Sequence, residues 1–321
     1  MKKRFKFDVQ KYLALCCLLV LVAFFSLFTQ TFLSTDNIIS VVLSTCVNGL
    51  LALGITFCVI TGSINISVGT MMTMSSVMIG VALVNWNLSL PVALLIGVLT
   101  AVLFGFANGF MITYMKLPPY IATMGTMMVC KGLALVITEG KPIYLSGNPV
   151  FSQIALGSIF GEGSRFYNAM LIFIVMCLIS YVILSKTIIG RNMYAVGSNM
   201  EAARLSGIRV YFWKILAHVL CAIFCAVAAI VMSSRLNAAQ PAVGAGYEGE
   251  ALCAAVIGGA SLSGGYGKVT GTIIGAFVMS VLTNGLRLMS VKQEWQQVAI
   301  GLVLILAVFS DVISRRKKES K

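Results

Sequence analysis

Charge is scarce in this sequence of 321 residues, of which only 10% are Asp, Glu, Lys or Arg, against roughly 25% in a soluble domain. The stretch 37–115 contains none of the four, which leaves room for about three membrane helices of ~20 residues each. With 59% hydrophobic residues and a mean hydropathy of +0.97, the composition argues against a soluble globular protein. We predict an all-α polytopic membrane protein, because lipid cannot satisfy exposed backbone polar groups.

Metal ligands and buried acids are also lacking. The chain has one histidine, His218, and none of its nine cysteines forms a CxxC pair, so a zinc site is not expected. We interpret the cysteines as small core residues and His218 as a hydrogen-bonded packing residue. No acid lies well inside a predicted span, where Lys131 and Arg287 are the other ionisable groups. Because such groups mark ion and proton pathways, an ion-coupled carrier would lack its usual coupling residue.

Nucleotide-binding motifs are present only in fragments. Residues 244–249 fit the pattern GxGxxG, but no strand precedes them. Residues 262–269 are similar to a phosphate-binding loop, yet Leu262 replaces its opening glycine and Val269 replaces the Ser or Thr that binds magnesium. We therefore predict no cofactor in this chain, so any ATP and Mg²⁺ would belong to a partner subunit.

Long apolar runs are abundant and predict about ten membrane helices, which places both termini on one side of the bilayer. The runs cover residues 12–33, 38–60, 67–85, 90–114, 120–138, 167–185, 213–234, 251–264, 270–288 and 296–313. Basic residues gather at the two termini and in the segment 186–214. The positive-inside rule predicts that these three regions are cytoplasmic.

We predict one transmembrane domain, 1–321, with cytoplasmic tails 1–11 and 315–321. A cytoplasmic loop covers 186–212, and a non-helical extracytoplasmic loop covers 139–166. The latter is either a docking surface for an extracytoplasmic partner or a passive connector. The net charge of +13 does not indicate nucleic-acid binding, because its distribution is that of cytoplasmic loops beside a lipid bilayer.

A short polar helix, 198–207, stands out in the cytoplasmic loop. Ser198 and Glu201 have the spacing of a capping box, and Glu201 and Arg204 suit the two ends of the helix dipole. Gly207 is placed to end the helix in a left-handed turn. Because two turns are too short to be stable alone, we expect the helix to pack on a surface and to contact a soluble partner. The residues assigned to this contact are Ser198, Asn199, Glu201, Ala202, Ala203, Arg204, Leu205 and Gly207.

Neutral polar residues within the spans suit a neutral polyhydroxyl solute, since they bind it without burying a charge. They also suit contacts between helices, and both interpretations stay open. The glycine-rich stretch 258–265 interrupts a span. Because non-helical backbone at membrane depth is tolerated only beside protein or a water-filled cavity, this break is the strongest pathway candidate. The candidates for lining a translocation pathway are Asn48, Asn65, Ser67, Asn108, Thr123, Gly258, Gly259 and Ser261.

Four segments carry motifs in a specific order. Residues 61–69 (Thr-Gly-Ser-Ile-Asn-Ile-Ser-Val-Gly) are similar to Thr-Gly-Gly-Ile-Asp-Leu-Ser-Val-Gly, and residues 119–126 (Pro-Tyr-Ile-Ala-Thr-Met-Gly-Thr) to Pro-Phe-Ile-Ala-Thr-Leu-Gly-Thr. Residues 197–208 are similar to a cytoplasmic coupling segment, and residues 246–275 to a long C-terminal signature that includes Ala-Ala-Val-Ile-Gly-Gly-Ala-Ser-Leu-Ser-Gly-Gly. Together, over most of the chain, these segments resemble the ABC sugar permeases of the ribose/xylose/arabinose class.

This resemblance implies the permease subunit of an ATP-driven, binding-protein-dependent importer of a pentose, hexose or similar small polar solute. It implies a multi-pass protein of the bacterial inner (plasma) membrane that is not itself an enzyme. The implied partners are an ATP-binding subunit with two nucleotide-binding domains, an extracytoplasmic solute-binding protein, and a second permease subunit in a homodimer. Asn65 stands where the family has aspartate, and Gly249-Glu250 where it has Leu-Asp. We therefore name no sugar.

Two other classes of protein stay open. A stand-alone ion-coupled secondary transporter would use glycine-broken helices to form a site at the bilayer midplane. A membrane receptor or scaffold would use the same cytoplasmic helix for signalling. Sensitivity of uptake to ATP depletion or to an ionophore separates the first two classes, and the absence of solute flux would favour the third.

Overall fold

The computed structural model describes residues 9–159, 161 and 164–319. Its helices are α1 (Val9–Phe28), α2 (Thr35–Ile60), α3 (Val68–Gly80), the π-helix η1 (Val81–Asn85), α4 (Leu90–Thr113), α5 (Pro119–Thr138), α6 (Pro149–Leu156), α7 (Asn168–Lys186), α8 (Ile188–Ser198), α9 (Met200–Leu205), α10 (Val210–Leu236), α11 (Tyr247–Ile257), α12 (Val269–Leu288) and α13 (Gln293–Glu319). The strands β1 (Ile143–Tyr144) and β2 (Ala238–Ala239) pair antiparallel. The predicted tails 1–11 and 315–321 lie partly outside the described residues.

Seven of the described helices are long and apolar enough to cross a membrane. They are α2, α3 continued by η1, α4, α5, α7, α10 and α12. Shorter apolar helical segments, Ala14–Phe28 and Gln293–Phe309, lie in α1 and α13. The chain is therefore a mostly helical, multi-pass integral membrane protein.

Helix α2 lies at the centre of the bundle, where every residue from Thr45 to Ile60 is buried. It packs against α7, α10, α11 and α12. Small residues allow close approach, since Gly49 contacts the ring of Phe173 in α7 and Gly54 contacts the backbone of α10. Contacts with four neighbouring helices therefore place α2 at the centre of the bundle.

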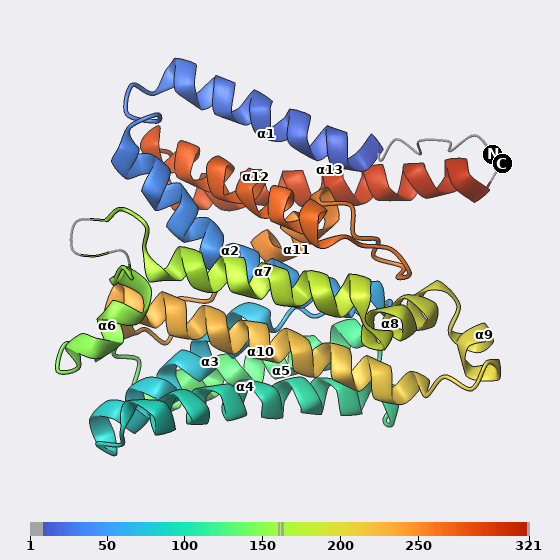
Figure 1. Ribbon diagram of the computed structural model, residues 1–321, viewed down its shortest axis with the longest axis horizontal. Coiled ribbons are helices and arrows are strands. Elements are labelled where there is room, and N and C mark those ends of the chain that lie inside the picture. Colours follow the sequence, from blue (N-terminus) through green and yellow to red (C-terminus); the bar gives the residue numbers. More distant parts are fainter. Residues whose placement is uncertain (1–8, 160, 162–163, 320–321) are drawn as a thin grey trace.

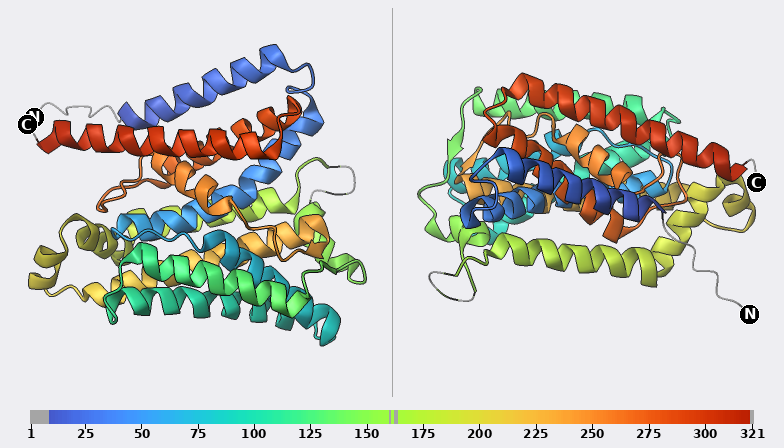
Figure 2. Two further views of the ribbon diagram at one scale, coloured as in Figure 1. Left: turned by 180° about the vertical axis from the view of Figure 1, so that it is seen from behind. Right: turned by 90° about the horizontal axis from the view of Figure 1, so that it is seen from above.

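The two ends of the bundle carry different structures. The start of α1, the end of α13, α8 and α9 lie at one end, and α6 lies at the other (Figure 1; Figure 2). The prediction that 139–166 is non-helical is wrong, because this segment contains α6 as well as β1. Pro149 is the first residue of α6, a position where proline favours a helix rather than breaking it. The Ser234 hydroxyl of α10 anchors α6 by donating to the Phe151 carbonyl at 2.6 Å.

His218 is a buried packing residue, as its solitary position predicts. Its Nε2 lies 2.9 Å from the Ser63 hydroxyl, and its Nδ1 lies 3.6 Å from the Cys58 sulfur. These contacts join α10 to the end of α2 and to the α2–α3 loop. The imidazole therefore helps to fix this loop, which leads to one of the polar clusters described below.

Candidate functional site

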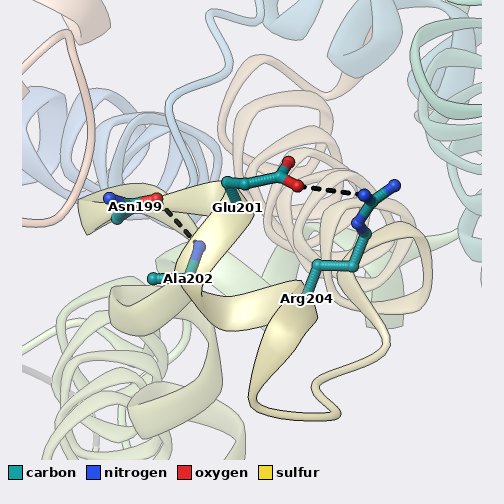
Figure 3. A network of polar contacts seen from close by, with 4 residues as sticks. All are labelled: Asn199, Glu201, Ala202 and Arg204. Atoms are coloured by element: carbon teal, nitrogen blue, oxygen red, sulfur yellow. Dashed lines mark hydrogen bonds and ion pairs between the residues drawn. The ribbon is translucent and has the colours of Figure 1, made fainter.

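The first candidate site is α9, the short polar helix at one end of the bundle (Figure 1). Its N-cap is Asn199, whose side-chain oxygen accepts a hydrogen bond of 2.9 Å from the Ala202 N–H (Figure 3). The prediction that Ser198 caps this helix is wrong, because α8 continues through Ser198 and Asn199 is the first residue with extended backbone. Asn and Ser are equally good caps, so the sequence pattern did not distinguish them.

The acidic residue of the predicted capping box has a different partner. Glu201 accepts a hydrogen bond of 2.9 Å from Arg204 (Figure 3). Glu201 lies in the first turn and Arg204 in the last, so both complement the helix dipole as predicted. Both side chains are mostly exposed, so the pair contributes little to stability. It leaves an acidic and a basic group accessible at the tip of α9.

The end of α9 and its packing agree with the sequence pattern. Gly207 has a φ of +80°, the left-handed conformation predicted for the residue that ends the helix. Ala203 is buried and clusters with Val196 of α8 and Val210 of α10, which supplies the packing surface that a short helix needs. Leu205, by contrast, is 80% exposed.

The predicted contact residues therefore form one exposed surface. All of the eight except Ala203 are exposed. A groove of about 360 Å³ lies beside them, where α8, the α9–α10 turn and the first turn of α10 meet. It is lined by Asn192, Ser206, Gly207, Ile208, Arg209, Phe212 and Trp213. This end of the molecule thus offers a protruding helix next to a groove with aromatic and basic lining.

The second candidate site is a broken span. After α10 the chain turns back into the bundle, where the Gly244 N–H donates to the Thr73 hydroxyl of α3 at 2.9 Å. Helix α11 follows and packs against α2 and α12. Its 11 residues measure about 16 Å at 1.5 Å per residue, roughly half the ~30 Å of a hydrocarbon core. A short helix therefore begins within the bundle.

The predicted membrane helix 251–264 is wrong at both ends, because α11 begins at Tyr247 and ends at Ile257. Gly258 has no space for a side chain, since its Cα faces the backbone of Gly271 in α12. Gly259 follows with a φ of +90°, which an α-helix cannot accommodate. The predicted break at the glycine-rich stretch is therefore present, and it shortens α11 instead of interrupting a full span.

The earlier start of α11 brings an acid into the bundle, so the prediction that no acid lies well inside the spans is wrong. Glu250 is in the first turn of α11, and its carboxylate accepts a hydrogen bond of 3.2 Å from Asn48. Asn48 lies midway along α2 and is 2% exposed. Its side-chain oxygen is buried and has no partner among the described residues.

Three other pathway candidates belong to a separate buried network. The Ser67 hydroxyl donates to the Asn65 side-chain oxygen at 2.7 Å and accepts from the Asn108 amide at 3.0 Å. The Asn108 side-chain oxygen in turn accepts from the Thr126 hydroxyl at 2.6 Å. All four side chains are at most 5% exposed. They join the α2–α3 loop to α4 and α5.

Thr123 extends this network to the loop backbone, since its hydroxyl accepts a hydrogen bond of 3.4 Å from the Ile66 N–H. The remaining candidates, Gly258, Gly259 and Ser261, lie beyond the end of α11 and are buried. The structure thus places the eight candidates in three groups. Asn48 belongs to the Glu250 cluster, four residues belong to the loop network, and three belong to the end of α11.

A bundle of membrane-crossing helices with a short helix starting inside it is typical of a membrane transport protein. The chain belongs to the family described as "branched-chain amino acid transport system / permease component", whose model matches residues 37–308. The chain is thus a transport permease, and its resemblance to the ribose and xylose class is confirmed by the relatives below. No solved structure matches it.

The relatives are sugar permeases. The chain is 37% identical to the ribose import permease protein RbsC of Bacillus subtilis (strain 168), over 99% of this chain and 97% of that protein. It is 32% identical to RbsC of Escherichia coli (strain K12), over 93% of this chain and 92% of that protein. It is 30% identical to the xylose transport system permease protein XylH of Haemophilus influenzae, over 97% of this chain and 98% of that protein.

Proposed function

We propose that this chain is the transmembrane permease subunit of a bacterial ABC importer and that its cargo is a pentose, a hexose or a similar small polar solute. The observation that carries this proposal is the similarity, over nearly the whole chain, to permeases for ribose and xylose. The buried polar groups of both clusters are mainly neutral, which suits an uncharged polyhydroxyl solute.

The proposed topology has about ten crossings with both termini in the cytoplasm. The seven long apolar helices, α1 and α13 account for nine of these. Residues 240–257 form the remaining crossing, as a run of turns followed by α11. This arrangement is supported by the position of α8, α9, the start of α1 and the end of α13 at one end of the bundle (Figure 1). It places the basic segment 186–214 in the cytoplasm, as the positive-inside rule requires.

The exposed surface of α9 is the proposed contact with the ATP-binding subunit. ATP and Mg²⁺ would be bound by that subunit, which would supply two nucleotide-binding domains, and this chain would catalyse no reaction. The protruding helix is held by Ala203 and leaves Glu201, Arg204 and Leu205 accessible. Closure of the ATPase can shift the bundle between two states only through different contact energies with each state, and α9 is the proposed place of those contacts.

The opposite end of the bundle is the proposed docking surface for an extracytoplasmic solute-binding protein. Segment 139–166 contributes α6 there, anchored to α10 through Ser234. A second copy of the chain would complete the translocation unit as a homodimer. Because the relatives are permeases of bacterial sugar import systems, the proposed location is the inner (plasma) membrane.

Within the bundle, the Asn48–Glu250 cluster is the best-supported part of the proposed pathway. Asn48 has a hydrogen-bond acceptor that no described residue uses, and Glu250 is only partly buried. The network of Asn65, Ser67 and Asn108 uses its hydrogen bonds within the protein. We therefore assign this network to the wall of the pathway and the first cluster to solute contact.

The energy source tests the proposed class directly. Uptake of radiolabelled ribose or xylose in cells is expected to stop when ATP is depleted and to continue when an ionophore collapses the ion gradients at constant ATP. The reverse pattern would contradict the proposal and favour an ion-coupled carrier with Glu250 as its coupling residue. Absence of flux for both sugars under all conditions would contradict the assignment to these solutes.

Charge reversal on α9 tests the proposed contact. Glu201→Arg breaks the pair with Arg204 and places a positive charge at the positive end of the helix dipole. We expect this variant to reach the membrane in normal amount and to lose uptake. The matched control for ATPase binding is Glu139→Arg, which reverses the exposed acid of the Glu139–Lys141 pair away from α9. Its readout is co-purification of the ATPase and not uptake, because Glu139 belongs to the proposed docking surface of the solute-binding protein. Normal uptake by Glu201→Arg would remove the proposed role of α9.

A further inference from the structure

Three segments that are distant in the sequence meet near α9 in a contact that we call the glycine junction. It consists of Ile60 at the end of α2, Gly197 and Ser198 at the end of α8, and Gly264 and Gly265 in the loop 258–268. The Gly265 N–H donates to the Ile60 carbonyl at 2.8 Å. A Cβ at Gly197 would overlap that same carbonyl oxygen. The three backbones are therefore in direct contact, with no side chain between them.

The loop side of the glycine junction requires glycine for two reasons. Gly264 and Gly265 have φ values of +89° and +75°, where a side chain is disfavoured. A Cβ on Gly264 would lie 2.7 Å from the Gly197 carbonyl oxygen, and one on Gly265 would lie 2.5 Å from the Ser198 hydroxyl. The positive φ values and the lack of room for a Cβ therefore both require glycine where the loop packs against the end of α8.

Tyr194 adds a second bond between the same partners. Its hydroxyl, on α8, donates to the Gly267 carbonyl in the loop at 2.6 Å. Burial, followed by the influence of the nearby Tyr266, raises the pKa of Tyr194 to about 12, so this hydroxyl remains a donor throughout the physiological pH range. Helix α8 is therefore bonded to the loop through a side chain and packed against it through backbone.

The glycine junction lies between the two candidate sites. On one side, α8 passes into α9 through the single residue Asn199. On the other side, the loop 258–268 continues directly from α11, which carries Glu250. A displacement of α9 cannot be absorbed by compressible side chains at the junction, because close-packed backbones are stiff. A connected route from α9 to α11 therefore runs through these contacts.

We propose that Tyr194, Gly197, Gly264 and Gly265 are positioning residues for transport, which transmit the movement of α9 to α11 and to the end of α2. This inference rests on the proposed function. The inference goes beyond the proposed function because it assigns the transmission of movement to the glycine junction. The long helices, which also join the two ends of the bundle, are not given this role.

Hydrogen–deuterium exchange on the full complex of permease and ATPase tests the proposal in the wild-type protein. A non-hydrolysable ATP analogue is expected to change exchange in α8–α9 and also in the loop 258–268, whose Gly265 amide is bonded to Ile60. A change confined to α8–α9 would overturn the glycine junction while leaving the importer intact. Failure of an ATPase to co-purify would instead overturn the proposed function on which the inference depends.

Two variants test whether the junction causes the response. In Gly197→Ala we expect the complex to assemble, the loop 258–268 to stop responding to nucleotide, and uptake per ATP hydrolysed to fall about thirtyfold, the upper range for coupling mutations. Tyr194→Phe removes one hydrogen bond and keeps the ring, so we expect a decrease of about threefold. The controls are Gly132→Ala, which has free space around it in α5, and Tyr181→Phe, which is exposed on α7.

The outcomes are decisive even if the alanine variant does not fold. If Gly197→Ala fails to assemble, Tyr194→Phe decides, because deletion of one hydroxyl leaves the packing intact. A wild-type loop response and a wild-type ratio of uptake to ATP hydrolysis in Tyr194→Phe would then overturn the proposal. If Gly197→Ala assembles, a wild-type loop response and a wild-type ratio of uptake to ATP hydrolysis in that variant would overturn the proposal.

Discussion

The two polar clusters inside the bundle differ in how fully their hydrogen bonds are used. Between the α2–α3 loop, α4 and α5, Ser67, Asn108 and Thr126 bond to one another and to Asn65. Between α2 and α11, Asn48 bonds to Glu250 through its amide, while its oxygen is buried without a partner among the described residues.

This difference separates a structural role from a transport role. A buried polar group that serves the fold is expected to be fully paired, because an unpaired one costs roughly 1–3 kcal/mol. A group that binds a passing solute needs a donor or acceptor that is unused while the solute is absent. By this criterion Asn48 and Glu250 suit solute contact better than Asn65, Ser67 and Asn108 do. The sequence pattern makes these three residues pathway candidates together with Asn48.

The largest effect is expected from breaking the paired network. Asn108→Leu keeps a similar volume but leaves the Thr126 hydroxyl without its acceptor, at a cost of about 1–3 kcal/mol, and it removes one of the two bonds of the Ser67 hydroxyl, which stays bonded to Asn65. We expect a lower melting temperature in detergent and less protein in the membrane, with normal uptake per molecule. Normal stability combined with lost uptake would contradict the structural role and move Asn108 into the pathway.

A smaller effect, on transport alone, is expected from Glu250→Gln. The glutamine amide can donate to the unpaired Asn48 oxygen, so stability should be unchanged or slightly higher. Loss of the carboxylate removes an acceptor whose bonds to solute hydroxyls are stronger than neutral ones. We expect uptake per molecule to fall roughly tenfold, equivalent to about 1.4 kcal/mol, in an assay normalised to membrane protein. A lower melting temperature with unchanged uptake would reverse the roles of the two clusters.

Asn48→Ala should have a milder effect on uptake than Glu250→Gln. It removes one hydrogen-bonding side chain while the carboxylate remains, so we expect a decrease of about threefold, or ~0.7 kcal/mol. The Asn48 oxygen has no partner among the described residues, and the Glu250 carboxylate that loses the Asn48 amide is only partly buried and can be hydrated, so the loss of stability should be smaller than in Asn108→Leu. A thermal melt that drops as far as that of Asn108→Leu would show that Asn48 is structural.

The smallest effect is expected outside both clusters, at the cap of α9. Asn199→Ala removes the cap and costs about 1 kcal/mol of local helix stability, so uptake should fall about twofold. Ser198→Ala keeps the backbone of the glycine junction and should lower uptake less than Asn199→Ala does, since Ser198 does not cap α9. Uptake measured side by side for the two variants checks the assignment. The opposite order would restore Ser198 as the cap.

The long helices could be predicted closely from the sequence, because lipid imposes long apolar runs. The expected 90–114 and 120–138 match α4 and α5 within one residue. The error at 251–264 has a physical cause, since α11 ends where Gly258 approaches the backbone of Gly271 in α12 and Gly259 has a positive φ, neither of which an apolar run reveals. Helix α6 was missed because Pro149 marks a loop and a helix start equally well.

The site could be predicted in part. The polar pattern around Glu201 located α9, because capping and charge are local signals. The partner of each polar residue could not be predicted, since Asn48 and Glu250 are 202 positions apart. Glu250 was missed because the predicted span began one residue after it. A glutamate about two helical turns before a glycine-rich break, next to an apolar run, is the signal that would have found it.

We propose that a separate ATPase, bound at α9, drives this permease. The most direct measurement is co-purification from the native membrane in mild detergent, with the recovered chains identified for the wild type, Glu201→Arg and Glu139→Arg. We predict an ATP-binding subunit with two nucleotide-binding domains in the wild type and in Glu139→Arg, and its loss in Glu201→Arg. Recovery of the wild-type chain alone, under conditions that preserve known membrane complexes, would contradict the proposal that a separate ATPase drives this permease.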